Sequence, residues 1–238
     1  MDGFTYTNIF ETKGIEYIII IAFLLLIIPF WLVLNKPRSI YDFALKTLGI
    51  LSVKVLKIPQ GLFYSKNHTW THLEPEGAAK VGVNDLLLHI TGSVELSGLK
   101  NPGQKITKGN VLVLITHDGK QLQITSPITG EIQSVNASLF ENPQVINNDP
   151  YGKGWIYKIK PDNWVAETNS YLMANSATQW MASELTRFKD FIATSMNKVS
   201  PNTSNVILQE GGELMDNPLS NMPDEVWKDF QSQFLDQY

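Results

Sequence analysis

The chain has 238 residues, of which 18% are charged and none is cysteine, and its formal net charge is -4 at pH 7. This mildly acidic balance supplies no basic surface for nucleic acid, so no nucleic-acid partner is expected. The absence of cysteine excludes disulfides, thiolate metal sites and cysteine nucleophiles within the chain.

An uncharged, apolar run occupies residues 17–34 near the N-terminus. About twenty apolar residues in a helix are enough to cross a hydrocarbon core of roughly 30 Å. The run therefore predicts a transmembrane helix over residues 15–35, preceded by an extramembrane segment over residues 1–14. The acidic N-terminal flank and the length of the run argue against a cleaved signal peptide.

The charges that follow this run indicate an orientation. Lys36, Arg38 and Lys46 are opposed only by Asp42. By the positive-inside rule, the N-terminus would lie outside a bacterial inner membrane and the C-terminal domain in the cytoplasm, with the lipid bilayer as one partner. Residues 36–60 form a juxtamembrane segment, whose apolar spacing fits an amphipathic helix on the membrane or a neighbouring subunit, or the first helix of the next domain.

Residues 61–164 alternate short β-rich runs with turn signals of glycine, proline and asparagine. Such spacing predicts a small antiparallel sandwich or barrel. Its clearest part is residues 111–132, where two β-branched, apolar runs flank Asp118 and Gly119, a dipeptide suited to a two-residue hairpin turn with positive φ. Pro127 then ends the second strand at a corner.

This hairpin and several other blocks resemble the glycine cleavage H-protein family and, more distantly, the lipoyl and biotinyl carrier domains. The matching blocks occur in the family's order, at Gly61 to Trp70, Val81 to Asp85, Asn136 to Leu139, Glu141 to Pro143 and Asp149 to Ile156. The resemblance implies a mainly β, barrel-sandwich hybrid (lipoyl-like) domain. In this chain it would be joined to an N-terminal transmembrane helix and a C-terminal α-helical extension.

The resemblance also implies a modified lysine at the tip of the hairpin, at a fixed distance before the proline of the corner. Counted back from Pro127, that position is Gly119, and the nearest lysine, Lys120, begins the return strand. A shift of one residue reverses the side to which a strand side chain points. The chain is therefore expected to bind no cofactor, and the alternative is a lipoyl group on Lys120, exposed by a β-bulge.

No catalytic motif emerges, and the resemblance implies a carrier without an active site, so the chain is not expected to be an enzyme. No metal site is expected either. His68 and His72 fall in a strand-like segment, where positions with this spacing share a face but lie about 13 Å apart, too far to bind one ion together. His68 is expected in a structural hydrogen bond.

Beyond the β domain, residues 165–198 carry apolar side chains at helical spacing and predict an amphipathic helix. Residues 199–238 form an acidic tail with a terminal helix after Pro223. Both apolar faces fit either their own domain or another protein. The residues predicted to dock on a partner are Trp227, Phe230, Phe234, Met181, Leu185 and Phe188.

Together these features predict a non-catalytic scaffold or accessory subunit of a bacterial inner-membrane complex, with a respiratory redox complex as the expected type. Its partners would be other subunits of that complex. The alternative function is a membrane-tethered lipoyl carrier modified on Lys120.

Overall fold

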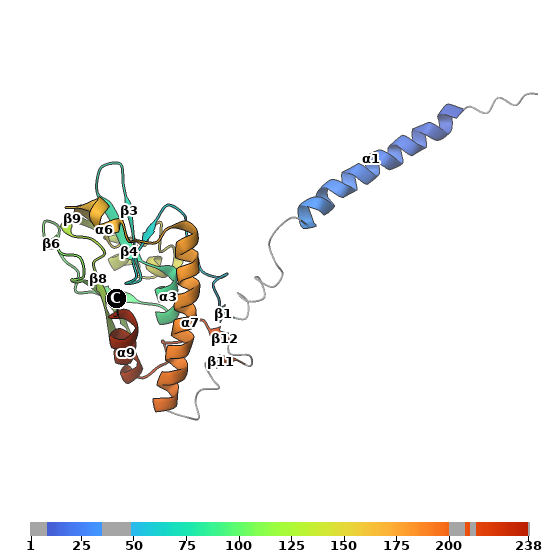
Figure 1. The fold of residues 1–238 in the computed structure, drawn as a ribbon. Coiled ribbons are helices and arrows are strands. Elements are labelled where there is room, and N and C mark those ends of the chain that lie inside the picture. The colour runs from blue at the N-terminus through green and yellow to red at the C-terminus, as the bar shows by residue number, and fades with distance from the viewer. Residues whose placement is uncertain (1–8, 35–48, 200–207, 210–212, 238) are drawn as a thin grey trace, which may run out of the picture. The chain divides into compact units, whose positions relative to one another are not determined.

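The part of the chain that the computed structural model describes comprises residues 9–34, 49–199, 208–209 and 213–237 (Figure 1). The chain divides into two units, Met1–Ala44 and Leu45–Tyr238. The first unit contains helix α1 (Ile9–Leu34). The second unit holds the other helices and strands of the described residues.

The expectation of a transmembrane helix over residues 15–35 is wrong. Spanning a bilayer takes a helix of about 20 mostly apolar residues, and none of the helices in the described residues is long and apolar enough to do so. The inner-membrane location, with the N-terminus outside, rested on that helix and is corrected with it. Most of the amphipathic segment expected within residues 36–60 lies outside the described residues.

Three antiparallel sheets make up the β part of the second unit. The largest contains, in spatial order, β2 (Phe63–Tyr64), β3 (Thr69–Leu73), β4 (Ala79–Val83), β10 (Tyr157–Pro161), β9 (Gly130–Val135) and β6 (Lys105–Ile106). The second contains β5 (Glu95–Ser97), β7 (Val111–His117) and β8 (Lys120–Thr125). The third joins β1 (Ile50–Leu51), β12 (Glu213–Met215) and β11 (Leu208–Gln209). These sheets agree with the mainly β domain that the sequence predicts.

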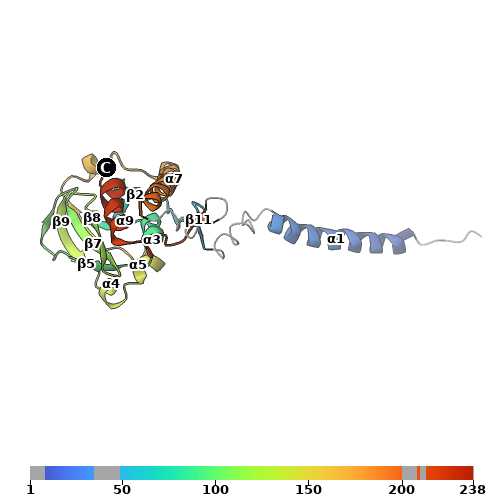
Figure 2. The same ribbon diagram turned by 90° about the horizontal axis from the view of Figure 1, so that it is seen from below.

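The helices of this unit are mostly short. They are α3 (Asp85–Thr91), α4 (Ser138–Glu141), α5 (Val145–Asn148), α6 (Trp164–Thr168), α7 (Ala174–Val199) and α9 (Asp224–Phe230), followed by a π-helical turn, η1 (Gln231–Leu235). The long helix α7 runs beside α9, and α9 lies next to strand β8, as two perpendicular views show (Figures 1 and 2). The C-terminus therefore returns to the hairpin formed by β7 and β8.

The core extends from the sheets to the C-terminal helices. Within the main sheet the ring of Trp70 packs on Gly82, where an added Cβ would lie only 2.7 Å from the ring, so the packing requires glycine. The apolar side of α7, which includes Phe188 and Ile192, is buried in the same cluster as Trp227 of α9. The C-terminal helices are thus part of the core of the unit, because their apolar faces are removed from water.

Candidate functional site

The hairpin of β7 and β8 has the two-residue turn that the sequence predicts. Asp118 and Gly119 have φ angles of +45° and +82°, a left-handed conformation that glycine adopts without steric cost and aspartate tolerates. His117 and Lys120 form the last pair of the ladder before the turn. A Cβ at Gly119 would meet nothing within 4 Å, so the tip of the hairpin is open.

Lys120 points toward the packed side of the hairpin. Side chains two residues apart on a strand share a face, so Lys120 shares the face of Leu122 and Ile124, which are 0% and 1% exposed. Its amine donates a hydrogen bond of 3.1 Å to the carbonyl oxygen of Ser220. The same nitrogen lies 5.7 Å from the centroid of a Trp227 ring. The amine is therefore held against the C-terminal part of the chain.

A β-bulge does not redirect Lys120. The irregularity in the pairing of this hairpin falls between Val111 and Val113, at the end of β7 away from the turn. From Lys120 to Ile124 the pairing is regular. The described ladder therefore lacks the feature that would expose the Lys120 amine at the tip.

Residues 220–236, here called the C-terminal cover, lie over this face of the hairpin (Figure 2). The indole of Trp227 stacks on the imidazole of His117, with the ring centroids 5.9 Å apart and the planes 5° from parallel. The indole N–H donates to the carbonyl oxygen of Leu219 at 2.8 Å. His117 donates from Nδ1 to the carbonyl oxygen of Ser93, at 2.5 Å. The cover thus rests on a hairpin side chain that is itself fixed.

The cover also blocks the free edge of the three-stranded sheet. Strand β8 is an edge strand, and an uncovered edge exposes backbone groups that can pair with another strand. The side chain of Gln231 accepts from the N–H of Gln123 through Oε1 at 2.8 Å. Its Nε2 donates to the carbonyl oxygen of Gln123 at 3.3 Å. One side-chain amide therefore occupies both backbone groups of that residue.

All six residues predicted to dock on a partner are buried within this chain. The rings of Phe230 and Phe234 stack with their centroids 4.8 Å apart. Phe188 meets both edge-on, at 5.6 and 5.7 Å. The residues Met181, Leu185, Phe188, Trp227, Phe230 and Phe234 contact their own chain in this conformation. Their docking on a partner stays a prediction, and it would require the cover to move.

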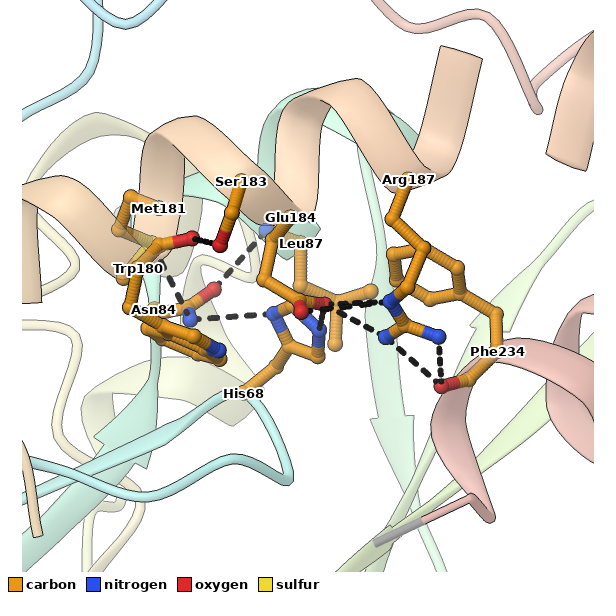
Figure 3. Close-up of polar contacts among 9 residues, drawn as sticks. All are labelled: His68, Asn84, Leu87, Trp180, Met181, Ser183, Glu184, Arg187 and Phe234. Carbon is orange, nitrogen blue, oxygen red and sulfur yellow. Dashed lines mark hydrogen bonds and ion pairs between the residues drawn. The ribbon is translucent and has the colours of Figure 1, made fainter. Parts of the chain in front are cut away.

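A buried polar network joins α7 to the β domain and to the cover, as Figure 3 shows. Glu184 is 2% exposed, and its Oε2 lies 3.3 Å from Nε2 of His68 and 2.5 Å from Nη2 of Arg187. The guanidinium also donates two hydrogen bonds, each of 3.1 Å, to the carbonyl oxygen of Phe234. Burial alone would raise the pKa of Glu184, but the hydrogen bonds and charges of His68 and Arg187 outweigh it and lower this pKa to about 2.

His68 makes the structural hydrogen bond that the sequence predicts. Asn84 caps α3 with its side-chain oxygen Oδ1, which accepts from the N–H of Leu87 at 3.0 Å. Its amide nitrogen therefore faces Nδ1 of His68, at 3.2 Å. Nε2 of the same ring lies 3.3 Å from Oε2 of Glu184. His68 thus connects the cap of α3 with the buried carboxylate of α7.

A second polar cluster fixes the chain just before the cover. Nδ1 of His89 lies 2.6 Å from Oδ1 of Asp216, and Nε2 lies 3.5 Å from Oδ2 of Asp85. Burial lowers the pKa of His89, but the two carboxylates more than compensate and raise it to about 9. Backbone bonds from Asn217 to His89 and from Leu219 to Ile90 reinforce this attachment. Residues 213–219 therefore form a fixed base from which the cover extends.

The sequence predicted the hairpin and the aromatic side of the C-terminal helix. It gave no sign that these two elements contact each other. It also missed Glu184, Arg187 and Gln231. The one available signal was the spacing of Glu184 and Arg187, three positions apart on one helix, which is usual for a solvated pair. Nothing local indicates that His68 lies beneath that pair.

Three antiparallel sheets and a two-residue hairpin define the class as a small antiparallel β domain. Comparison with known proteins narrows the class to a family. Residues 62–184 match the family model described as Glycine cleavage H-protein. The chain belongs to the glycine cleavage H-protein family.

Two relatives that are more than 30% identical agree with this assignment. The Glycine cleavage system H protein of Psychrobacter sp. (strain PRwf-1) is 34% identical over 106 residues, which cover 44% of this chain and 84% of that protein. The Probable glycine cleavage system H protein of Pyrococcus abyssi (strain GE5 / Orsay) is 31% identical over 134 residues, 56% of this chain and 99% of that protein. A crystal structure of a glycine cleavage system H protein from Mycobacterium marinum matches at 24% identity with a TM-score of 0.44, and covers 49% of this chain and 93% of that one.

Proposed function

We propose that this chain is a non-catalytic accessory protein that presents the H-protein fold to partner proteins without carrying a lipoyl group itself. The observation that carries the proposal is the register of the hairpin tip. Gly119 stands at the open apex, and Lys120 stands on the packed side with its amine bonded to Ser220. The chain has the fold of a lipoyl carrier, but the apex of its hairpin has no lysine to which a lipoyl group could be attached.

A lipoyl group, which the family resemblance implies, does not fit these residues. A carrier lysine must extend beyond the turn so that a modifying enzyme can reach its amine. The Lys120 amine is instead hydrogen-bonded to a backbone carbonyl and lies beside the Trp227 ring. Leu122 and Ile124, which share its face, are fully packed.

The expected partners are proteins that recognise H proteins, such as components of a glycine cleavage system. Family membership supports this choice, because the matched residues 62–184 include all six strands of the main sheet and the hairpin. A surface built on these strands can be shared with the relatives even where the hairpin tip differs. Binding without a lipoyl group would make the chain a competitor or an adaptor for such partners.

The second candidate is a lipoyl carrier modified on Lys120. Membership of the H-protein family is the observation that favours it, and Lys120 is the lysine of the hairpin that stands beside the turn. This candidate needs the Lys120 amine to leave Ser220 and become accessible.

Intact-mass analysis of the protein isolated from its native cells separates the two candidates. The accessory protein is expected at its unmodified mass, and peptide mapping should return an unmodified peptide containing Lys120. A lipoyl adduct on that peptide would establish the carrier and overturn the first proposal. Binding to purified glycine cleavage proteins, followed by biolayer interferometry, tests the partner class, and absence of binding to all of them would contradict it.

A further inference from the structure

We infer that residues 220–236 are a displaceable cover, which controls access to the face of the hairpin that carries His117 and Lys120. The inference rests on the proposed function in taking the hairpin as an element that faces partners. The cover lies outside residues 62–184, where the family match is found. It is therefore an addition of this chain to the shared fold.

The connections of the cover to the rest of the unit are made by side chains. In the described residues, the backbone-to-backbone hydrogen bonds of residues 220–236 have their partners within residues 217–236. The cover joins the hairpin through the side chains of Lys120 and Gln231 and through the stacking of His117 on Trp227. A segment attached in this way can open without breaking a strand ladder.

The base of the cover would stay in place during such an opening. Strand β12 pairs with β1, and His89 and its carboxylates bind the same region to α3. Residues 213–219 are therefore attached by a ladder and by partly buried polar bonds. The change from backbone ladder to side-chain contacts at residue 220 marks the position of the hinge.

The contacts that hold the cover closed lie near its C-terminal end, around Phe234. The Arg187 guanidinium lies 3.6 Å from the centroid of the Phe234 ring and donates to the Phe234 carbonyl oxygen. Phe234 also stacks on Phe230 and packs edge-on against Phe188. These contacts of Phe234 lie on α7 and within the cover. A change at the Lys120 amine on loss of the Phe234 ring would therefore report movement of the cover.

Opening would expose three features together. These are the Lys120 amine, the backbone groups of Gln123 on the sheet edge, and the aromatic surface of α7 beneath the cover. A free edge strand beside an apolar helix is a surface to which a protein partner can add. The cover and such a partner would therefore compete for the same place.

The test measures how fast Lys120 reacts with the amine-specific reagent N-hydroxysuccinimidyl acetate, with peptide-level mass spectrometry and the exposed Lys153 as internal reference. In the wild-type chain, Lys120 is expected to react at least about tenfold more slowly than Lys153. In Phe234→Ala, the Lys120 rate should rise at least about fivefold, because truncating a buried aromatic favours local opening. Phe140→Ala, at a phenylalanine that is 61% exposed, is the matched control and should leave the rate unchanged.

A synthetic peptide of residues 217–238, added to the Phe234→Ala variant, should bind in place of the cover and restore slow labelling of Lys120. Equal rates for Lys120 and Lys153 in the wild-type chain would overturn the inference. So would a folded Phe234→Ala variant with the wild-type Lys120 rate.

If Phe234→Ala unfolds, hydrogen exchange of the wild-type chain decides the question. The amides of α9 and η1 should then exchange before those of β7 and β10, and simultaneous exchange would contradict the displaceable cover. A lipoyl adduct found on native Lys120 would overturn the proposed function and leave these results on the cover unaffected.

Discussion

Among the residues that attach the C-terminal part of the chain, His89 has a pKa that is raised well above its ordinary value. It binds Asp216 and Asp85 from two sides, and its pKa is raised from 6.5 to about 9. A group whose pKa is higher in the folded chain than in the unfolded chain holds its proton more tightly after folding. It therefore stabilises the fold as long as it is protonated. Its contribution is therefore full below pH 6.5 and disappears as the pH rises through about 9.

His89→Gln should remove this pH dependence. The free energy of unfolding of the wild-type chain, measured by urea titration, should exceed that of the variant most at pH 6, and the difference should shrink by pH 9.5. Asp216→Asn removes one of the two carboxylates. Its free energy of unfolding at pH 6 should lie between those of the wild-type chain and His89→Gln. A difference that is constant from pH 6 to 9.5 would show that His89 does not titrate with the raised pKa.

Glu184 illustrates what residue patterns leave out. It lies three positions after Met181 and one before Leu185, so the helical stripe places it at the border of the apolar face. A carboxylate there is usually solvated, and burying one is costly unless it is paired. Its partner His68, and Phe234, whose carbonyl oxygen accepts from the neighbouring Arg187, come from positions far apart in the sequence. Only the folded chain brings them to α7.

Among the elements, the hairpin of β7 and β8 was predictable because its determinants are local. The Asp118-Gly119 dipeptide and the flanking β-branched runs specify a type of turn that fixes the register of both strands. The register in turn fixes that Lys120 faces inward. The inward direction of Lys120, which is the central feature of the site, was therefore predictable from the sequence.

Gly119→Ala tests the conformation of this turn. With φ at +82°, an L-residue at this position is strained, and the variant should lose about 1–2 kcal/mol of unfolding free energy. Gly103 also has a positive φ, of +85°, and Gly103→Ala serves as a comparison in a turn of another sheet. An unchanged urea midpoint for Gly119→Ala would mean that the turn differs from the one described.

The C-terminal helices show the opposite case. Their apolar stripes were evident from spacing, but a stripe does not identify the surface that covers it. The sequence left open whether α7 and α9 pack on their own domain or on another protein, and the structure brings them together over the hairpin (Figure 1). The contact between Gln231 and the β8 edge had no sequence signal, because either polar residue is ordinary on a surface.

At the scale of the whole molecule, the separate blocks of family resemblance predicted the family and the fold of the β domain. They could do so because they follow one another in the family's order. They lie within or next to the matched residues 62–184. The N-terminal expectation failed, since an apolar run predicted a membrane span that no described helix provides. The C-terminal segment that covers the hairpin lies outside the residues that match the family.

The register of the hairpin tip is tested most directly by exchanging its two residues. The double variant Gly119→Lys with Lys120→Gly and the wild-type chain would each be incubated with lipoate, ATP and a lipoate–protein ligase that modifies glycine cleavage H proteins, with circular dichroism as the control for folding. Intact-mass spectrometry should show the wild-type chain unmodified and the exchanged variant carrying one lipoyl group, because only the latter has an amine at the open apex. A lipoyl group on Lys120 of the wild-type chain, or a folded exchanged variant that stays unmodified, would contradict the account.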